Sequence, residues 1–468
     1  MEGEVTVETS VQAEWKRAIA ERFKDSEDFV YKQLKRGGER AEILFVRTAA
    51  DWQSVYEKLV LPFYDRNIAE HYEDYAASLP NRVQPKNLGD AMEKLAEGHV
   101  MLDTGRDIHM FVFRNQPQKD IREAAVETVI QGPLLAFSAE VDKNIMLLRQ
   151  RCYQPSLAVD LMTVGSRSKT HVALLYDLEK ADPATVAEIK RRIREIRMPV
   201  VQAVGQLSML LGESPRSLIP RVLVTERPDR ATLNLSQGKV VVLMEGTPFA
   251  LIAPTTLFDF FSSMEDIYQH YFISRFLLIL RYFAVFICLT LPASYVAITA
   301  YNPEVFRVEL ALSIAGNRFA VPYPAFLEVF VMMLAMELLL EASIRLPKAI
   351  GSAATTVGGL ILGQAATEAG LVSSIMIIIV ATVAISNFVI PINSMSFAVR
   401  VAKYGLLAGA TLFSLLGLAL GIALMIGYLA SVDSFGQPFL KLFENDDRHV
   451  KTTQHQAGGD VRHSEEVS

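Results

Sequence analysis

The chain has 468 residues, of which 51% are hydrophobic and 21% are charged, and its formal net charge is −6. This acidic balance provides no basic surface of the kind that binds nucleic acid, so we expect no nucleic-acid partner. The only two cysteines, Cys152 and Cys288, make neither a disulfide framework nor a zinc-binding pattern. We therefore expect no metal and no cofactor.

The N-terminal stretch MEGEVTVETSVQAEWKRAIAERF is acidic and polar. It lacks the basic segment and following apolar run of a signal peptide. Residues 1–270 are therefore expected to stay on the cytoplasmic side of any membrane that the chain crosses.

An internal repeat runs through the first half of the chain. AMEKLAEGHV (91–100) and ATLNLSQGKV (231–240) share Ala, Leu, Gly and Val at matching places, 140 residues apart. Each precedes two short apolar runs around a glycine, which is typical of a β-hairpin. Upstream, AEILFVR (41–47) and THVALLYDL (170–178) each predict a strand followed by a helix. The repeat predicts two similar α/β subdomains.

Charged residues become rare after residue 270. Five hydrophobic segments follow: 282–303, 324–340, 349–367, 371–399 and 404–432. All of them except 324–340 are free of charge. A membrane-spanning helix needs about 20 apolar residues. We therefore expect an integral membrane protein whose all-α polytopic domain has about five hydrophobic segments.

Basic residues at the segment ends predict the orientation, because Lys and Arg favour the cytoplasmic side. Five spans would place three basic pairs on that side: Arg275 with Arg281, Arg345 with Lys348, and Arg400 with Lys403. Five spans also leave the tail from Asp433 outside. If 349–367 only dips into the membrane and returns, four spans leave the tail inside. We favour five.

The expected organisation follows from these patterns. It comprises a cytoplasmic α/β subdomain over 1–150, a second over 151–270, a transmembrane helical domain over 271–432 and a polar tail over 433–468. The chain has no GxxxxGK[ST], HExxH or GxSxG motif. We therefore expect a protein that is not an enzyme.

The segment MMLAMELLLEASIRLP is typical of a membrane helix except for its charges. Glu337, Glu341 and Arg345 are spaced by four residues and share one helix face. Gln364 and Glu368 repeat this spacing in the next segment. A charge at the bilayer centre costs a few kcal/mol, so these faces should avoid lipid. Ion pairing between helices and a water-filled ion path explain them equally well.

Arg345 pairs well only with Glu341, so Glu337 and Glu368 have no obvious partner in the sequence. We therefore expect the two faces to line or border a water-accessible path formed when subunits assemble. Gly359 and Gly363 form a GxxxG pattern, which allows close helix packing. Packing within one chain is the favoured interpretation over contact between subunits.

Several stretches of this chain resemble one protein family. They include GSRSKTHVALLYDL, ERPD followed by EGTPF, RLP followed by GGLILGQAATEAGLVS, and DSFGQPFL. In these stretches, from about residue 20 to 437, the chain resembles the A subunits of the GerA-type spore germination receptors. It departs from them after Phe439, where their proline-rich ending is missing, and this favours the stage V sporulation protein AF branch as a candidate.

The resemblance implies a multi-pass protein of the spore inner membrane that helps to convert a nutrient signal into ion release. It implies partners as well: further copies of the chain, with a pentamer expected, and receptor B-type and C-type subunits or stage V sporulation membrane proteins. Such an oligomer would form or gate a cation channel.

Two other functions compete with this one. The first is a non-conducting scaffold or accessory subunit of the dipicolinate-release (stage V) complex. The second is a secondary transporter, which would need paired inverted repeats in its membrane helices. The visible repeat lies in the soluble half, which counts against a transporter.

Overall fold

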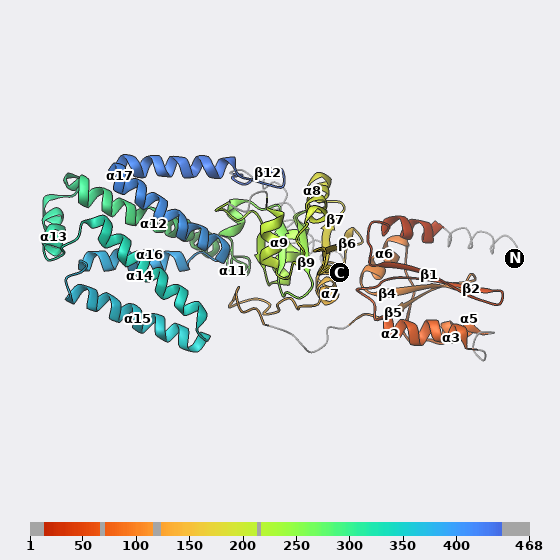
Figure 1. Ribbon diagram of the computed structural model, residues 1–468. Coiled ribbons are helices and arrows are strands. Elements are labelled where there is room, and N and C mark those ends of the chain that lie inside the picture. The colour runs from red at the N-terminus through yellow and green to blue at the C-terminus, as the bar shows by residue number, and fades with distance from the viewer. Residues whose placement is uncertain (1–13, 66–70, 116–122, 213–216, 442–468) are drawn as a thin grey trace, which may run out of the picture.

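The computed structural model places three parts in a row, two α/β subdomains and one helical region (Figure 1). It describes residues 14–65, 71–115, 123–212 and 217–441. The tail beyond residue 441 and the first 13 residues lie outside the described residues.

The first subdomain is a five-stranded antiparallel sheet in the order β1-β2-β4-β5-β3. Its strands are β1 (Phe29–Arg36), β2 (Glu39–Val46), β3 (Arg82–Val83), β4 (His99–Asp103) and β5 (Ile108–Val112). Its helices are α2 (Trp52–Val55), the π-helix η1 (Tyr56–Val60), α3 (Leu61–Tyr64), α5 (Tyr72–Ser78) and α6 (Leu88–Ala96).

Helices cover both faces of this sheet, which explains the unbroken apolar run in β2. Ile43 and Phe45 pack with the α2–α5 layer, whereas Leu44 and Val46 pack with α6 on the other face. Successive side chains of a strand point to opposite faces, so a strand covered on both sides is apolar at every position.

The second subdomain repeats this strand order element for element, as β6-β7-β9-β10-β8. Its strands are β6 (Leu157–Val164), β7 (Thr170–Asp177), β8 (Leu223–Thr225), β9 (Val240–Met244) and β10 (Ala250–Ala253). Its helices are α7 (Val141–Arg149), α8 (Pro183–Glu195), α9 (Val204–Leu211), α10 (Pro228–Ser236), the 3-10 helix η2 (Leu257–Phe260) and α11 (Glu265–Tyr268). The two similar sheets agree with the internal repeat.

The glycine shared by the two repeats has the same function in both. Gly98 ends α6 with φ +94°, and Gly238 ends α10 with φ +84°. A Cβ atom would lie 2.5 Å from the carbonyl oxygen of Ala49 in the first case and of Lys180 in the second. Only glycine combines positive φ with so close an approach of backbone.

Helix α7 lies before residue 150, the boundary expected from sequence, but packs on the second sheet. Its Val141, Ile145 and Leu148 belong to the buried cluster that contains Leu175 of β7 and Leu235 of α10. The second subdomain therefore begins on the N-terminal side of α7.

A buried ion pair joins the two subdomains. Asp28 and Arg149 are 0% and 1% exposed in their side chains, and their closest atoms are 2.7 Å apart. Ser26 and Thr48 donate hydrogen bonds to the Asp28 carboxylate. The backbone also crosses the joint, since Glu27 N donates to the Val159 carbonyl of β6 at 2.8 Å.

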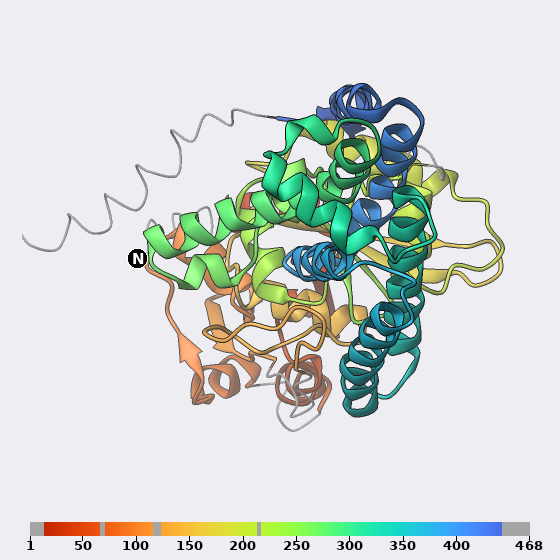
Figure 2. The same cartoon turned by 90° about the vertical axis from the view of Figure 1, so that its left-hand side faces the viewer.

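The helical region contains α12 (Tyr271–Tyr301), the 3-10 helix η3 (Pro303–Val305), α13 (Val308–Arg318), α14 (Ala325–Arg345), α15 (Lys348–Glu368), α16 (Ser374–Phe388) and α17 (Asn393–Ser431). Two of these, α12 and α17, are long and apolar enough to cross a membrane. Figure 2 looks at this region from its free end and shows the α14–α15 hairpin to one side of the remaining helices.

Helix α17 reverses direction at Ser414, whose backbone is non-helical with φ 57°. Its arms, 393–413 and 415–431, pack against each other, and the backbones of Gly409 and Gly417 touch. The uncharged stretch after residue 404 was expected to be a single span and is therefore divided between two arms. Apart from the short α13, the helical region thus consists of α12, α14, α15, α16 and the two arms of α17.

The chain end returns to the second subdomain, where β11 (Asp433–Ser434) pairs with β12 (Gln437–Pro438). Ser434 Oγ donates to the Arg221 carbonyl at 2.8 Å, and Leu257 N donates to the Phe439 carbonyl at 2.9 Å. Phe435 and Phe439 are buried in the two hydrophobic clusters of this subdomain. The chain that follows the helical region therefore returns to the subdomain that precedes it.

Candidate functional site

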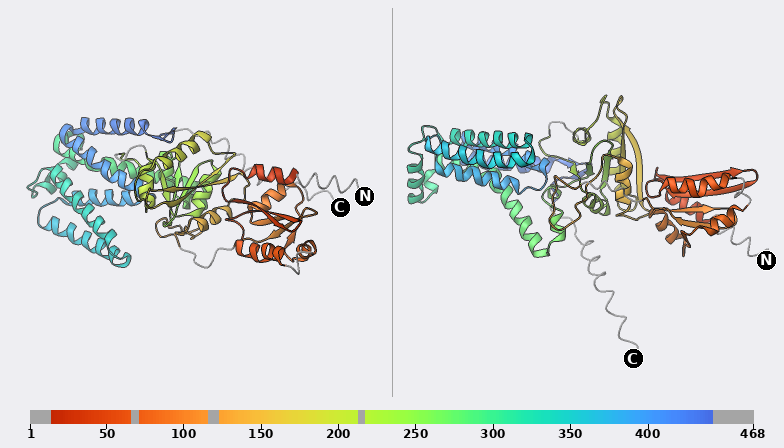
Figure 3. Two further views of the ribbon diagram at one scale, coloured as in Figure 1. Left: turned by 45° about the vertical axis from the view of Figure 1, so that its right-hand side comes forward. Right: turned by 90° about the horizontal axis from the view of Figure 1, so that it is seen from below.

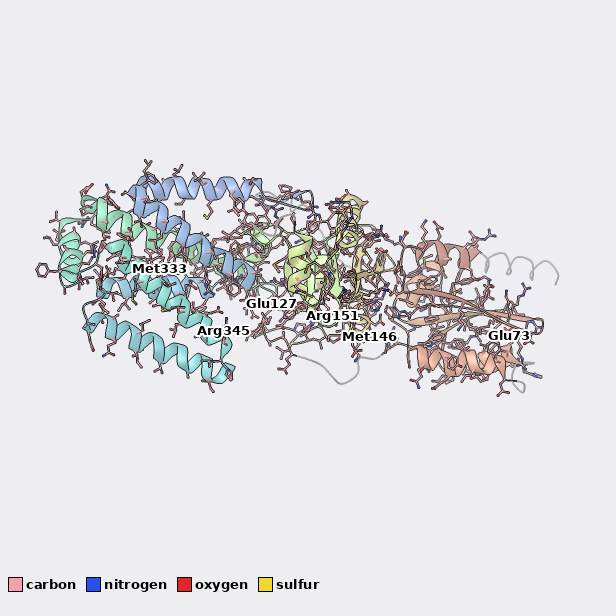
Figure 4. All side chains as sticks on the ribbon, in the orientation of Figure 1. Glu73, Glu127, Met146, Arg151, Met333 and Arg345 are labelled. Carbon is pink, nitrogen blue, oxygen red and sulfur yellow. The ribbon has the colours of Figure 1, made fainter. Side chains whose placement is uncertain are left out.

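The predicted charged segments form a helical hairpin, α14–α15. Arg345 marks its turn, on the side of the helical region toward the second subdomain (Figure 4). The two helices are antiparallel, because Gly351 lies against Ser343 and Gly358 lies against Leu339. The five polar residues proposed from sequence are distributed along this hairpin.

Glu337 faces α17 inside the helical region. Arg400 donates from Nε to one oxygen of the carboxylate at 2.7 Å, and Lys403 donates to the other at 2.8 Å. Lys403 is only 5% exposed. Helix spacing offered no obvious partner for Glu337, and its partners lie 63 and 66 residues further along the chain. Helix spacing alone does not reveal pairs between distant helices.

The other four polar residues lie on the surface of the hairpin. Glu341 and Arg345 form an ion pair of 2.8 Å, with side chains 56% and 78% exposed. Gln364 donates to Glu368 at 2.9 Å, also on the exposed surface. The first pair lies at the turn of the hairpin and the second at its open end. One chain alone therefore does not bring the two pairs together.

The GxxxG residues make ordinary contacts with side chains of the same chain. A Cβ on Gly359 would lie 3.5 Å from Leu339 of α14, and one on Gly363 would lie 3.7 Å from Ile377 of α16. Backbone-to-backbone contact occurs instead between Gly409 and Gly417. Sequence reasoning missed these two, because they lie eight residues apart on either side of the reversal.

A second acidic residue, Glu328, is buried in the helical region at 1% exposure. It accepts hydrogen bonds from the backbone N and Oγ of Ser373, both at 2.6 Å, and lies 3.4 Å from Arg318 Nε. Ser373 is the N-cap of α16. Glu328 therefore fixes the start of α16 to α14.

The ERPD sequence forms a buried junction between the second subdomain and the helical region. Arg227 is fully buried and donates to the carbonyls of Glu127 and Pro133, at 3.1 and 3.0 Å. It also pairs with Asp229 at 2.6 Å. Glu226 accepts from the backbone N of Glu127 at 2.9 Å. The connecting segment before α7 is thus held against α10.

The junction continues to the start of α12. Asp229 accepts from the Tyr268 hydroxyl at 2.8 Å, and Arg230 donates to the Ser262 carbonyl at 2.6 Å. Asp266 in turn pairs with Arg281 of α12. A chain of contacts therefore runs from α10 through α11 into the first apolar helix.

The pKa values of two carboxyl groups in this junction shift in opposite directions. Burial alone would raise the pKa of Asp229, but hydrogen bonds from Arg227 and Tyr268 outweigh it and lower the pKa. At Glu127, burial dominates and raises the pKa despite the charge of Arg230, whose Nε lies 3.3 Å away. Glu127 therefore takes up a proton more readily than Asp229 does.

One group of possible metal ligands lies far from this junction, in the first subdomain (Glu73 in Figure 4). The ligand atoms of Glu73, Asp107 and His109 lie within 4.8 Å of one another. Burial, followed by the nearby charge of Arg82, lowers the pKa of His109. That positive charge opposes a cation, so we interpret the group as a polar cluster.

Together, a repeated α/β region and a bundle of apolar helices with buried charges define a membrane-type protein with a large soluble domain. Comparison with known families identifies it further. The model of the Bacillus/Clostridium GerA spore germination protein family matches residues 17–455. The chain belongs to the GerA family of spore germination proteins, and it resembles the A subunits of germinant receptors.

Individual relatives agree with this assignment. Spore germination protein B1 of Bacillus subtilis is 35% identical over 361 residues, covering 73% of this chain and 75% of the relative. Spore germination protein KA of the same organism is 31% identical over 436 residues, covering 90% and 80%. GerQA of Bacillus cereus is 33% identical over 424 residues, covering 89% and 85%.

Among solved structures, the N-terminal domain of the A subunit of the Bacillus megaterium germinant receptor GerK3 matches with 26% identity and a TM-score of 0.39. The match covers 51% of this chain and 92% of that domain.

Proposed function

We propose that the chain is a non-enzymatic subunit of a spore germination complex, which oligomerises and forms or gates a cation channel in response to germinants. The supporting observation is the exposed charge on the α14–α15 hairpin. Glu341, Arg345 and Glu368 are exposed on helices whose other surface residues are mostly apolar. Such side chains are costly in lipid unless water or another subunit covers them.

The buried cluster of Glu337, Arg400 and Lys403 has a different role in this proposal. One carboxylate neutralises only one of the two cations, so the cluster keeps a net positive charge next to the hairpin. We assign it to holding α14 against α17. The acidic residues that attract cations are then Glu341 and Glu368, on the surface that further copies would cover.

The proposed setting is the spore inner membrane, with the two α/β subdomains and residues 433–441 on the cytoplasmic side. Arg275, Arg345 and Arg400 all lie at the end of the helical region nearest the subdomains, which is the arrangement that Lys and Arg favour. The proposed partners are further copies of the chain and B-type and C-type receptor subunits or stage V membrane proteins. A membrane-impermeant thiol reagent should fail to label a cysteine introduced at residue 107 in intact cells.

The channel proposal is tested by Glu368→Gln and Glu341→Gln in the full chain. We expect intact assembly but slower cation release during germination, and lower cation conductance of purified protein in planar bilayers. Glu140→Gln, on the surface of the second subdomain, is the matched control. Unchanged conductance in both hairpin variants, with assembly intact, would contradict the channel and favour the non-conducting scaffold.

A further inference from the structure

A cavity of about 480 Å³ lies where the second subdomain meets the first turns of α12. Its walls come mainly from α10, the 256–267 segment and α12, with Leu223 of β8 and Lys441 at the edge. Figure 3 (right) shows the start of α12, in green, standing apart from the other helices, so this cavity is at the edge of the helical region. The cavity is separate from the charged hairpin of the proposed ion path, and it shares Arg230, Ser262 and Asp266 with the junction described above.

The acidic groups in the cavity wall already have cationic partners. Asp259 pairs with Lys239 at 2.7 Å, and Asp266 pairs with Arg281. Their charges are therefore neutralised within the protein. A ligand in the cavity meets the remaining basic groups rather than free carboxylates.

Two arginines in the wall have donors left for a ligand. Arg230 is 3% exposed, and its Nη1 has no hydrogen-bond partner among the described residues. Arg275 is exposed and lies over the Tyr271 ring at 5.2 Å, and no carboxylate in the described part of the chain pairs with it. A buried guanidinium donor without an acceptor is unfavourable, and an anionic oxygen would satisfy it.

Apolar surface continues from this cavity along α12. Leu278 and Tyr282 line the cavity, and on the adjoining helix surface Phe276, Ile279 and Phe283 are 65%, 66% and 58% exposed. Aromatic and basic residues at the start of a membrane helix are typical of the interface between lipid headgroups and acyl chains. A ligand with an anionic head and an apolar tail matches both surfaces.

We propose that this cavity binds an anionic phospholipid, with its phosphate against Arg230 and Arg275 and its acyl chains along α12. Because the ERPD junction shares Arg230, the lipid would connect the bilayer to the contact between α10 and α12. Zwitterionic lipid carries the same phosphate but adds a cationic amine, which Arg275 repels, so anionic headgroups should bind more tightly.

The test is native mass spectrometry of the full chain in detergent, titrated with phosphatidylglycerol or phosphatidylcholine. We expect preferential retention of phosphatidylglycerol, and about tenfold weaker retention in Arg275→Gln, because a charge-assisted contact is lost. Arg307→Gln removes the same charge at the N-cap of α13, beyond the far end of α12, and should bind normally. Arg230→Lys keeps the buried charge but not the forked donor, and should weaken binding as well.

Three results would overturn the proposal. The first is equal retention of the two lipids by the unmodified chain. The second is an equal loss in the Arg275 and Arg307 variants. The third is displacement of the lipid by glycerol phosphate at equal concentration, which would identify the ligand as a soluble phosphate rather than a lipid.

Discussion

The two α/β subdomains have the same strand order but different neighbours. The first contacts the rest of the chain mainly at the Asp28–Arg149 joint, whereas the second contacts the first subdomain, the helical region and the returning chain end. Their cores are alike down to the glycines that end α6 and α10. The same fold therefore lies at the periphery of the molecule in the first subdomain and connects its other parts in the second.

The difference is concentrated at the start of one helix. In the first subdomain Asn87 is the N-cap of α6, and its side chain accepts from Asp90 N at 2.8 Å in an exposed position. In the second, Arg227 has the same position before α10 but is fully buried and reaches two other segments. Asn87 therefore caps only its own helix, whereas Arg227 at the matching position connects α10 to the segment before α7.

The largest expected effect comes from breaking the joint between the subdomains. Asp28→Asn leaves Arg149 buried without a counter-charge, which typically destabilises by about 3–5 kcal/mol. Asp142→Asn is the matched control, because Asp142 also crosses the joint, to Arg47 at 3.3 Å, but in an exposed pair worth less than about 1 kcal/mol. Thermal unfolding of the full chain in detergent measures both, and equal losses would contradict the assignment.

The next effect tests whether the two cores are equivalent. Gly98→Ala and Gly238→Ala each combine a positive φ, worth about 1–2 kcal/mol, with a clash against a carbonyl oxygen. We expect both variants to lose more than about 2 kcal/mol by the same assay. Gly246→Ala separates the two causes, since Gly246 has φ +86° but open space around it. If all three variants lose the same free energy of unfolding, the clash with the carbonyl oxygen contributes nothing.

The smallest effect is a pH dependence confined to the junction. Burial raises the pKa of Glu127 in the folded chain above its ordinary value of 4.5, so the folded state binds a proton more readily than the unfolded state. Glu127 therefore reduces stability as pH rises from 4.5 through its raised pKa. The Tm of Glu127→Gln minus the Tm of the unmodified chain should therefore increase as the pH rises from 4.5 to 8. A constant Tm difference would show that Glu127 does not titrate in this range.

Sequence patterns predicted the features that depend on nearby residues. The repeat around Gly98 and Gly238 predicted two similar sheets, because both glycines meet the same local backbone requirement. The pairing of Glu341 with Arg345 also followed from spacing by four. The pairing of Glu337 did not, since it depends on how α14 packs against α17.

The reversal in α17 illustrates the same limit. The stretch from residue 404 to 432 carries no charge, and Ser414 is neither glycine nor proline. No local signal there predicts a turn, so the sequence favours one long span. Contacts of Ser414 Oγ with the Ala297 carbonyl and Asn302 Oδ1 at the end of α12 accompany the reversal. Likewise, the charges of ERPD in the sequence are typical of a surface helix. In the structure they are buried, because the 123–135 segment packs over them.

The return of the chain end also determines the order in which the protein can be completed during synthesis. Phe435 and Phe439 fill positions in the core of the second subdomain, yet the ribosome makes them after the whole helical region. The helical region is therefore an insertion within that subdomain, between α11 and β11. Until residues 435–439 have been made, the subdomain lacks two core aromatic rings, so its core is completed only after the helical region has been synthesised.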